Sequence, residues 1–95
     1  MKLIPWQLFN DIEAYTTCAY DEQHQLMNMS FNGEDDQLVL KNRKKLATEL
    51  NTDLQHMVAT FQQHTTQFLK VSLKDGGKGM YSRDDAFIGY DAMYT

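Results

Sequence analysis

The chain has 95 residues, 42% of them hydrophobic, and a formal net charge of −4 at pH 7. A chain of this size is expected to form a single domain over residues 1–95, and its aromatic residues (one Trp, five Tyr and five Phe) supply enough apolar area to argue against disorder. No stretch is long and apolar enough for a membrane-spanning helix, and the apolar start is interrupted from Gln7 onward, so a signal peptide is not expected either.

The cysteine content indicates in which cellular compartment the protein is expected. The single cysteine, Cys18, excludes an internal disulfide and a cysteine-based zinc cluster. We therefore expect a protein of the reducing cytoplasm.

The charge is distributed unevenly. Residues 1–36 hold seven acidic side chains and one basic side chain, Lys2. This distribution argues against direct nucleic-acid binding, which needs a basic face, and favours a larger partner protein with a basic surface.

Residues 5–20 have the apolar spacing of an amphipathic helix. Leu8, Ile12 and Tyr15 follow one another at intervals of four and three residues. Pro5 suits a first helical turn because its missing N–H would have no partner there. The pattern predicts an N-terminal helix.

Residues 25–41 alternate instead between apolar and polar side chains. Met27, Met29 and Phe31 are separated by polar residues, and an Asn-Gly dipeptide follows at 32–33. This arrangement is typical of a β-hairpin, which we predict for residues 25–41.

A helix beginning after Asn32 is the alternative for this region. The acidic residues at 34–36 would then lie in its first turn, where they favour the positive end of the helix dipole. Such a helix would run far beyond the average length and would place Arg43 in the middle of its apolar face.

Residues 43–70 predict a long central amphipathic helix, with Asn42 as its N-cap. No Gly or Pro interrupts this stretch, and we expect Leu54 and Phe61 on its buried face. The apolar stripe keeps intervals of three and four residues at Leu46, Leu50, Leu54, Met57, Phe61, Thr65 and Phe68. Because this spacing resembles heptads, a homodimer held together by the helix is possible.

The pattern of residues 71–95 predicts short extended segments. Val71 and Leu73 alternate with polar residues, and a glycine-rich turn at 75–79 makes a second hairpin plausible. The fold class is therefore α+β: an N-terminal helix, a β-hairpin, a long central helix, and a short β or extended C-terminal segment.

The glycine-rich turn is also a candidate ligand site. The sequence Asp-Gly-Gly-Lys-Gly could present backbone N–H groups and Lys78 to a phosphate. A P-loop, however, requires Ser or Thr where Gly79 stands. A turn that needs positive φ explains the same residues without a ligand.

Two groups of side chains could carry catalysis or a metal. Glu49, Asp53 and His56 would share one face of a helix, and Cys18 is the only thiol. We interpret the first group as a solvated face and Cys18 as a small core or boundary residue. No catalytic residue, metal or cofactor is therefore expected.

Charged and aromatic residues provide the expected binding surface. The basic residues at 41–45 are interpreted as internal partners of the acidic residues at 34–36. The aromatic residues at 81–94 form either an interface or a cover for the core. The predicted partner-binding residues are Glu34, Asp35, Asp36, Tyr81, Phe87, Tyr90 and Tyr94.

The function predicted from the sequence is a small acidic, non-enzymatic interaction protein. It would inhibit or regulate a larger, nucleic-acid-handling protein by occupying its basic surface, as a phage or mobile-element product could. The alternatives are a small-ligand or phosphate-binding domain that uses the loop at 75–79, and a homodimeric module.

Overall fold

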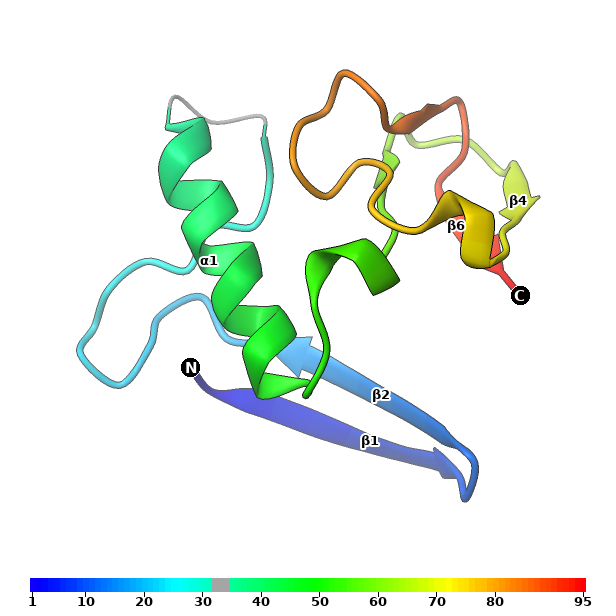
Figure 1. The fold of residues 1–95 in the computed structure, drawn as a ribbon. Coiled ribbons are helices and arrows are strands. Elements are labelled where there is room, and N and C mark those ends of the chain that lie inside the picture. The colour runs from blue at the N-terminus through cyan, green and yellow to red at the C-terminus, as the bar shows by residue number, and fades with distance from the viewer. Residues whose placement is uncertain (32–34) are drawn as a thin grey trace.

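The structure, a computed structural model, describes residues 1–31 and 35–95. These residues contain one α-helix, α1 (Asp36–Glu49), and three separate pairs of strands. Figure 1 shows α1 on one side of the molecule, the hairpin β1–β2 below it, and the strands β4 and β6 on the other side. The predicted order of helix, hairpin and long central helix is wrong.

The N-terminal residues form a β-hairpin, not a helix. Strand β1 (Leu3–Phe9) pairs antiparallel with β2 (Ile12–Thr17), and the Trp6 Nε1–H donates a hydrogen bond to Thr16 Oγ1 at 2.6 Å. A two-stranded sheet has free edges, so it tolerates Pro5. The β-branched and aromatic residues of β2 prefer extended backbone, and this preference outweighs the coincidental helical spacing.

The residues of 25–41 that the structure describes do not form the predicted hairpin, and its expected Asn-Gly turn at 32–33 lies outside the described residues. Residues 25–31 follow an irregular path with one isolated bridge, between Tyr20 and Leu26, and α1 then begins at Asp36. Asp35 is the N-cap, since its carboxylate accepts a hydrogen bond from the Leu38 N–H at 3.0 Å. The rejected alternative, a helix with acidic residues in its first turn, is therefore nearer to the structure.

The long helix over residues 43–70 is also absent. The helix α1 ends at Glu49, and Asn51 follows in the left-handed conformation with φ of 57°. Asn is among the few residues that adopt this conformation readily, and it commonly terminates helices. A homodimer built on helix 43–70 is thereby excluded.

After α1 the chain forms only short elements. These are the 3₁₀ turn η1 (Leu54–His56), strand β3 (Thr60–Phe61), strand β4 (Phe68–Lys70) and the 3₁₀ turn η2 (Leu73–Asp75). Residues 43–70 therefore include the end of α1 and all of η1, β3 and β4. The regular apolar spacing across these four elements is a coincidence.

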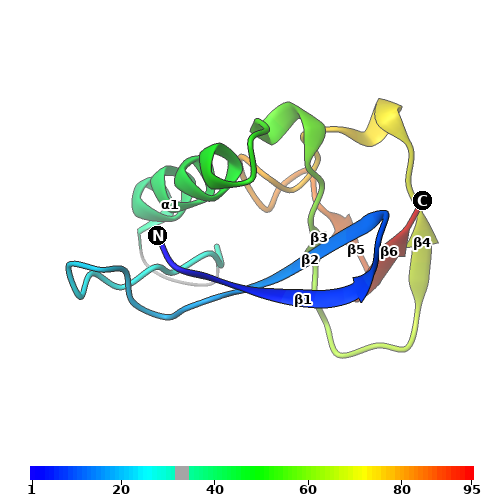
Figure 2. The same ribbon diagram turned by 90° about the horizontal axis from the view of Figure 1, so that it is seen from below.

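The C-terminal half contains two pairs of parallel strands. Strand β3 pairs with β5 (Phe87–Ile88), and β4 pairs with β6 (Ala92–Tyr94). Figure 2 shows β5 beside β3 and β6 beside β4. The second hairpin considered for residues 71–82 is not formed, because η2 and a series of turns occupy this stretch.

The glycine-rich turn packs directly on the backbone that leads into β3. The Gly77 N–H donates to the Met57 carbonyl at 2.7 Å, and the Ala59 N–H donates to the Lys78 carbonyl at 2.9 Å. A Cβ on Gly79 would lie 2.2 Å from the Ala59 carbonyl oxygen, so no larger residue fits. The turn uses its glycines for close backbone contact, and this overturns the phosphate-binding alternative for 75–79.

The core lies between α1, η1 and the glycine-rich turn. Ala47, Leu54 and Met80 form a buried cluster there. The expected burial of Leu54 is confirmed, although it lies in η1, whereas Phe61 is only half-buried. Within the described residues, no helix has the length and apolar character needed to cross a membrane.

Replacing Leu54 tests this core. Leu54 is 4% exposed, so we expect Leu54→Ala to lower the free energy of unfolding by about 2–5 kcal/mol in urea denaturation. The matched control is Leu73→Ala, because Leu73 is 93% exposed and its truncation should change stability by less than about 0.5 kcal/mol. Equal effects of the two substitutions would contradict the assigned core.

Candidate functional site

A cleft of about 590 Å³ lies between the segment 26–31, α1, β3 and the turn at 79–86. Its volume is in the range of small-molecule sites. Apolar walls come from Met29, Phe31 and Phe61, and polar groups come from Arg43, Gln62 and Arg83. The cleft therefore combines apolar surface with a few polar groups, as ligand sites do.

Arg43 builds the floor of this cleft. Its Nε–H donates to the Met29 carbonyl at 2.9 Å, and its Nη1 donates to the carbonyls of Gly79 and Met80. The guanidinium also lies 4.3 Å from the centre of the Phe31 ring. Burial lowers the pKa of Arg43 from its ordinary value. Because Nε and Nη1 are committed to these backbone carbonyls, Arg43 joins the segments that form the walls of the cleft.

The neighbouring Asn42 fixes the same segment. It is 2% exposed, and its Nδ2 donates to the Asn28 carbonyl at 3.0 Å. Asn42 is thus a buried residue of α1 and not the predicted helix cap. Together Asn42 and Arg43 hold a segment of irregular backbone against the helix.

Three further side chains of the cleft are available to a ligand. Gln62 and Arg83 are exposed, and Cys18 is half-buried. The amide of Gln62 can both donate and accept hydrogen bonds, and the guanidinium of Arg83 can bind a phosphate. Cys18, interpreted from the sequence as a boundary residue, lines the cleft.

A second ordered feature is the loop between β3 and β4. The carboxylate of Asp91 accepts hydrogen bonds from the Gln63 N–H at 2.9 Å and the His64 N–H at 2.8 Å, and from Thr65 Oγ1 at 3.2 Å. These bonds, above all the one from Gln63, lower the pKa of Asp91. His64 itself is exposed and held in the left-handed conformation with φ of 58°. One carboxylate therefore stabilises a strained loop that presents an imidazole.

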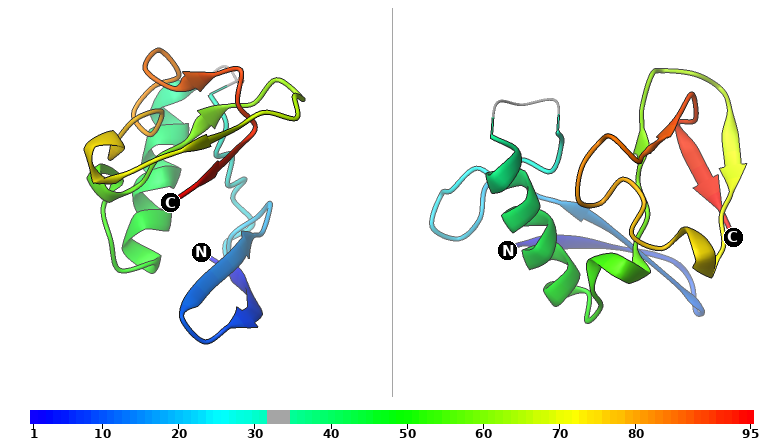
Figure 3. Two further views of the ribbon diagram at one scale, coloured as in Figure 1. Left: turned by 90° about the vertical axis from the view of Figure 1, so that its right-hand side faces the viewer. Right: turned by 45° about the horizontal axis from the view of Figure 1, so that its top comes forward.

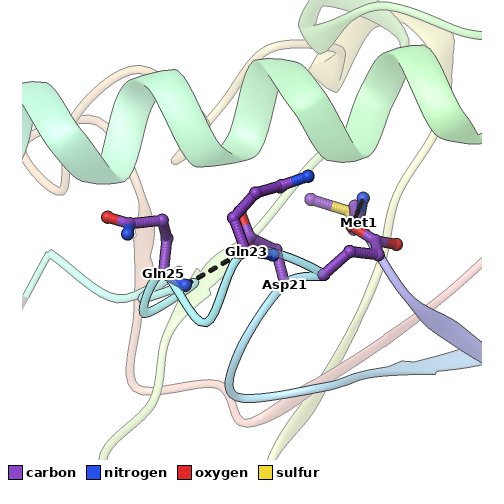
Figure 4. A network of polar contacts seen from close by, with 5 residues as sticks. Met1, Asp21, Gln23 and Gln25 are labelled. Atoms are coloured by element: carbon purple, nitrogen blue, oxygen red, sulfur yellow. Dashed lines mark hydrogen bonds and ion pairs between the residues drawn. The ribbon is translucent and has the colours of Figure 1, made fainter.

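A second cleft, of about 580 Å³, lies between α1 and the loop at 21–25. Asp21 Oδ1 accepts from the N–H groups of Gln23 at 2.9 Å and Gln25 at 2.8 Å, and these bonds, first that from Gln25, lower the pKa of Asp21. The Met1 ammonium donates to Glu22 at 2.9 Å. Figure 4 shows this network beside α1, so these acids order a loop rather than an external binding surface.

The predicted acidic binding residues have local roles. Asp35 caps α1 and Asp36 is the first residue of the helix, while Glu34 lies outside the described residues. Arg43, expected to pair with these acids, instead contacts the carbonyls of the cleft. The expected partner with a basic surface stays a prediction.

The predicted aromatic residues are spread over the C-terminal half. The Tyr81 hydroxyl accepts a hydrogen bond from Gln55 Nε2 at 2.9 Å, and Lys78 Nζ lies 5.3 Å from the Phe87 ring centre. Tyr90 is half-buried and Tyr94 is exposed. The start of α1 and strand β6 lie on opposite sides of the molecule in Figure 1, so Asp36 in α1 and Tyr94 in β6 are far apart.

The acid–histidine group is only partly assembled. Nδ1 of His56, at the end of η1, and Oδ1 of Asp53, just before η1, are 2.8 Å apart, and both side chains are exposed. This contact lowers the pKa of Asp53. Glu49 is the last residue of α1. Within residues 1–31 and 35–95, no three His, Cys, Asp or Glu side chains are grouped to hold a metal ion.

Sequence reasoning missed Gln62, His64, Arg83 and Asp91. Asp91 gave no signal, because the loop that it contacts is 26 to 28 residues away in the sequence. Arg43 did give a signal, because it would lie on the apolar face of a helix that starts after Asn32. We misinterpreted this position as an argument against the helix.

Comparison with known proteins identifies relatives. Residues 15–95 match the protein family described as "Multi-copper polyphenol oxidoreductase laccase". The chain is 40% identical over 57 residues to the Bacillus subtilis (strain 168) protein named "Purine nucleoside phosphorylase YlmD". It also superimposes on the crystal structure of the hypothetical protein YfiH from Bacillus licheniformis, with a TM-score of 0.71 and 34% identity.

The matches cover most of this chain but little of the relatives. The match to YlmD covers 60% of this chain and 20% of YlmD, and the match to YfiH covers 76% of this chain and 27% of YfiH. The chain thus spans about a fifth to a quarter of the length of these relatives.

These relatives correct the predicted function. A family of enzymes and a relative named as a phosphorylase overturn the prediction of a non-enzymatic inhibitor or regulator. They also give no support to a phage or mobile-element origin. The prediction failed because it relied on short catalytic motifs, and the chain has none of those considered. The similarity to YlmD is instead spread over 57 residues.

Arg43 is tested by a conservative change. Arg43→Lys keeps the charge but cannot reach the carbonyls of Met29, Gly79 and Met80 together, so we expect a loss of about 2–3 kcal/mol in the free energy of unfolding. The matched control is Arg83→Lys at the exposed side of the cleft, which should leave stability unchanged. An equal, small effect of both changes would contradict the role of Arg43.

Asp91 is tested by the pH dependence of stability. Its pKa in the folded protein lies below the ordinary value of 3.8, so its stabilisation is present above that pH and is lost as the pH falls through the lower folded value. We expect the stability difference between the wild type and Asp91→Ala to shrink as the pH falls from about 6 to about 3. The control is Asp84→Ala, and a pH-independent difference for Asp91→Ala would contradict this role.

Proposed function

Because the chain belongs to the family described as multi-copper polyphenol oxidoreductase laccase, we propose that it is part of an enzyme acting on purine nucleosides by phosphorolysis. The observation that carries this proposal is the 40% identity with the relative named as a purine nucleoside phosphorylase. In this proposal the cleft beside Arg43 forms one wall of the nucleoside site.

The reaction sets the groups that such a site needs. An oxygen of inorganic phosphate bonds to C1′ of the ribose while the bond from C1′ to the purine nitrogen breaks. The electron pair of that bond goes to the purine, which takes up a proton. The site must therefore hold a flat base, orient its polar edge, and bind a phosphate dianion next to the sugar.

The cleft offers a side chain for each of these tasks. The half-buried ring of Phe61 supplies a face on which a purine can stack. The adjacent amide of Gln62 matches the donors and acceptors of a base edge. The exposed guanidinium of Arg83 supplies positive charge for phosphate, whereas the Nε and Nη1 donors of Arg43 already bind backbone carbonyls.

The described residues contain no cluster of His, Cys, Asp or Glu side chains that would serve the copper chemistry named in the family description. A copper site needs several imidazole, thiolate or thioether ligands directed at one point. The part of the chain that the structure describes has no group of three or more His, Cys, Asp or Glu side chains so arranged. We therefore derive no step through copper from these residues.

The proposed location is the cytoplasm. The support is the single cysteine, which fits a compartment in which structural disulfides do not form.

Nucleoside binding tests the proposal directly. We expect inosine, added to the isotope-labelled chain with phosphate present, to shift the NMR signals of Phe61, Gln62 and Arg83. Because stacking on an aromatic ring contributes about 1–3 kcal/mol per base, Phe61→Ala should weaken inosine binding by about 5-fold to 150-fold.

Matched variants assign the other roles. Gln62→Ala should weaken inosine binding, whereas Gln67→Ala, an exposed glutamine outside the cleft, should not. Arg83→Ala should weaken phosphate binding, with Lys74→Ala as the control. The proposal is wrong if millimolar inosine shifts no signal of the cleft, or if the control variants weaken binding as strongly.

A further inference from the structure

The cleft beside Arg43 is lined by positive charge without negative charge. Its described lining residues include Arg43 and Arg83, and none of them is Asp or Glu. In the right view of Figure 3 the segment at 26–31 and the turn at 79–86 lie beside α1, from which Arg43 projects. The whole chain has 13 acidic and 9 basic side chains, so this local excess of positive charge does not follow from the composition. A cleft lined by one sign of charge attracts ligands of the opposite sign.

One nitrogen of Arg43 remains for a ligand. Nε and Nη1 donate to backbone carbonyls, whereas the described residues offer no hydrogen-bond acceptor to Nη2. Nη2 is not sealed inside the protein, because every polar side-chain atom that is buried in the described part of the chain has a partner. Since Arg43 lines the cleft, the two N–H groups of Nη2 are accessible from there.

The surroundings of Arg43 hold this nitrogen at a fixed position. Phe31 is buried, and its ring centre lies 4.3 Å from the guanidinium carbon. Together with the hydrogen bonds to the carbonyls of Met29, Gly79 and Met80, this contact fixes the guanidinium plane. An anion that binds Nη2 therefore costs little side-chain entropy.

The charge of Arg43 also has no acidic counterpart. In residues 1–31 and 35–95, no carboxylate forms an ion pair with Arg43 or Arg83. Burial lowers the pKa of Arg43, and no described carboxylate raises it. Asp85, two residues after Arg83, instead accepts a hydrogen bond from the Gly79 N–H at 3.0 Å. A partly buried cation without a counter-ion is costly, and a bound anion removes that cost.

We propose that Nη2 of Arg43 and the guanidinium of Arg83 together bind inorganic phosphate as a dianion in this cleft, with Arg43 as the inner, preorganised ligand. Phosphate oxygens match guanidinium N–H groups, and the two guanidinium charges balance the charge of the dianion. The choice of phosphate rests on the proposed phosphorolysis, in which an oxygen of this phosphate bonds to C1′ of the ribose while both guanidinium groups stay protonated. Phosphate binding itself needs no nucleoside, so the two proposals can fail separately.

The test is a titration of the isotope-labelled full chain with inorganic phosphate, with chloride keeping the ionic strength constant. We expect saturable shifts of the Nε–Hε NMR signals of both Arg43 and Arg83, and a melting temperature that rises with the phosphate concentration. Arg83→Gln should weaken phosphate binding about tenfold or more, because it removes charge-assisted hydrogen bonds.

A matched pair of charge insertions makes the test independent of the structural role of Arg43. Gln62→Glu adds a carboxylate to the cleft and should weaken phosphate binding about tenfold, because it repels the dianion and competes for the guanidinium groups. Gln67→Glu adds the same charge at an exposed position outside the cleft, so binding should change less than about twofold. Because Arg43→Lys also destabilises the fold, this pair decides the outcome where that variant unfolds.

Phosphate and inosine separate this proposal from phosphorolysis. The proposal is wrong if phosphate shifts neither guanidinium signal or only that of Arg83, or if Gln67→Glu weakens binding as much as Gln62→Glu. It is also wrong if ribose 5-phosphate binds more than about tenfold more tightly than inorganic phosphate, because the site then belongs to a phosphate ester. If phosphate binds as expected and inosine shifts no signal of the cleft, this proposal stands and phosphorolysis is wrong.

Discussion

The side chain of Arg43 is the interaction on which the arrangement of this fold depends. It projects from α1 and joins the helix to two segments far apart in sequence, through the carbonyl of Met29 and the carbonyls of Gly79 and Met80. A planar guanidinium suits this role because its donors point in several fixed directions at once. Removing them would leave partly buried carbonyls without partners, which costs more than an ordinary surface contact.

Hydrogen bonds from polar side chains replace regular secondary structure elsewhere too. Asn42 binds the backbone at Asn28, Asp85 accepts from the Gly79 N–H at 3.0 Å, and Asp91 accepts from the loop at 63–65. In a chain with one helix and short strand pairs, many backbone groups have no ladder partner. Side-chain carboxylates and amides satisfy them, and they thereby fix the walls of the cleft.

The sequence predicted little of this fold, for physical reasons that particular residues illustrate. The expected burial of Leu54 was informative. The acidic residues also carried a helix-start signal, because capping is a local effect, but we preferred the hairpin to the helix that they indicated. The spacing of apolar residues over 43–70 was misleading. Intervals of three and four residues also arise by chance when a helix, a 3₁₀ turn and short strands follow one another. Arg43 and Asp91 could not be assigned, because their partners are 14 to 37 and about 27 residues away.

Connectivity links the cleft to the β4–β6 strand pair. Phe61 ends β3 and lines the cleft, Phe68 begins β4, and residues 62–67 join them. Asp91 lies between β5 and β6 and ties this joining loop to the strands on both sides. Since two-residue and three-residue strands resist displacement only weakly, the position of Phe61 and Gln62 depends on how firmly β4 and β6 are held. A change that loosens the β4–β6 pair therefore alters the geometry of the cleft wall, although neither strand lines the cleft.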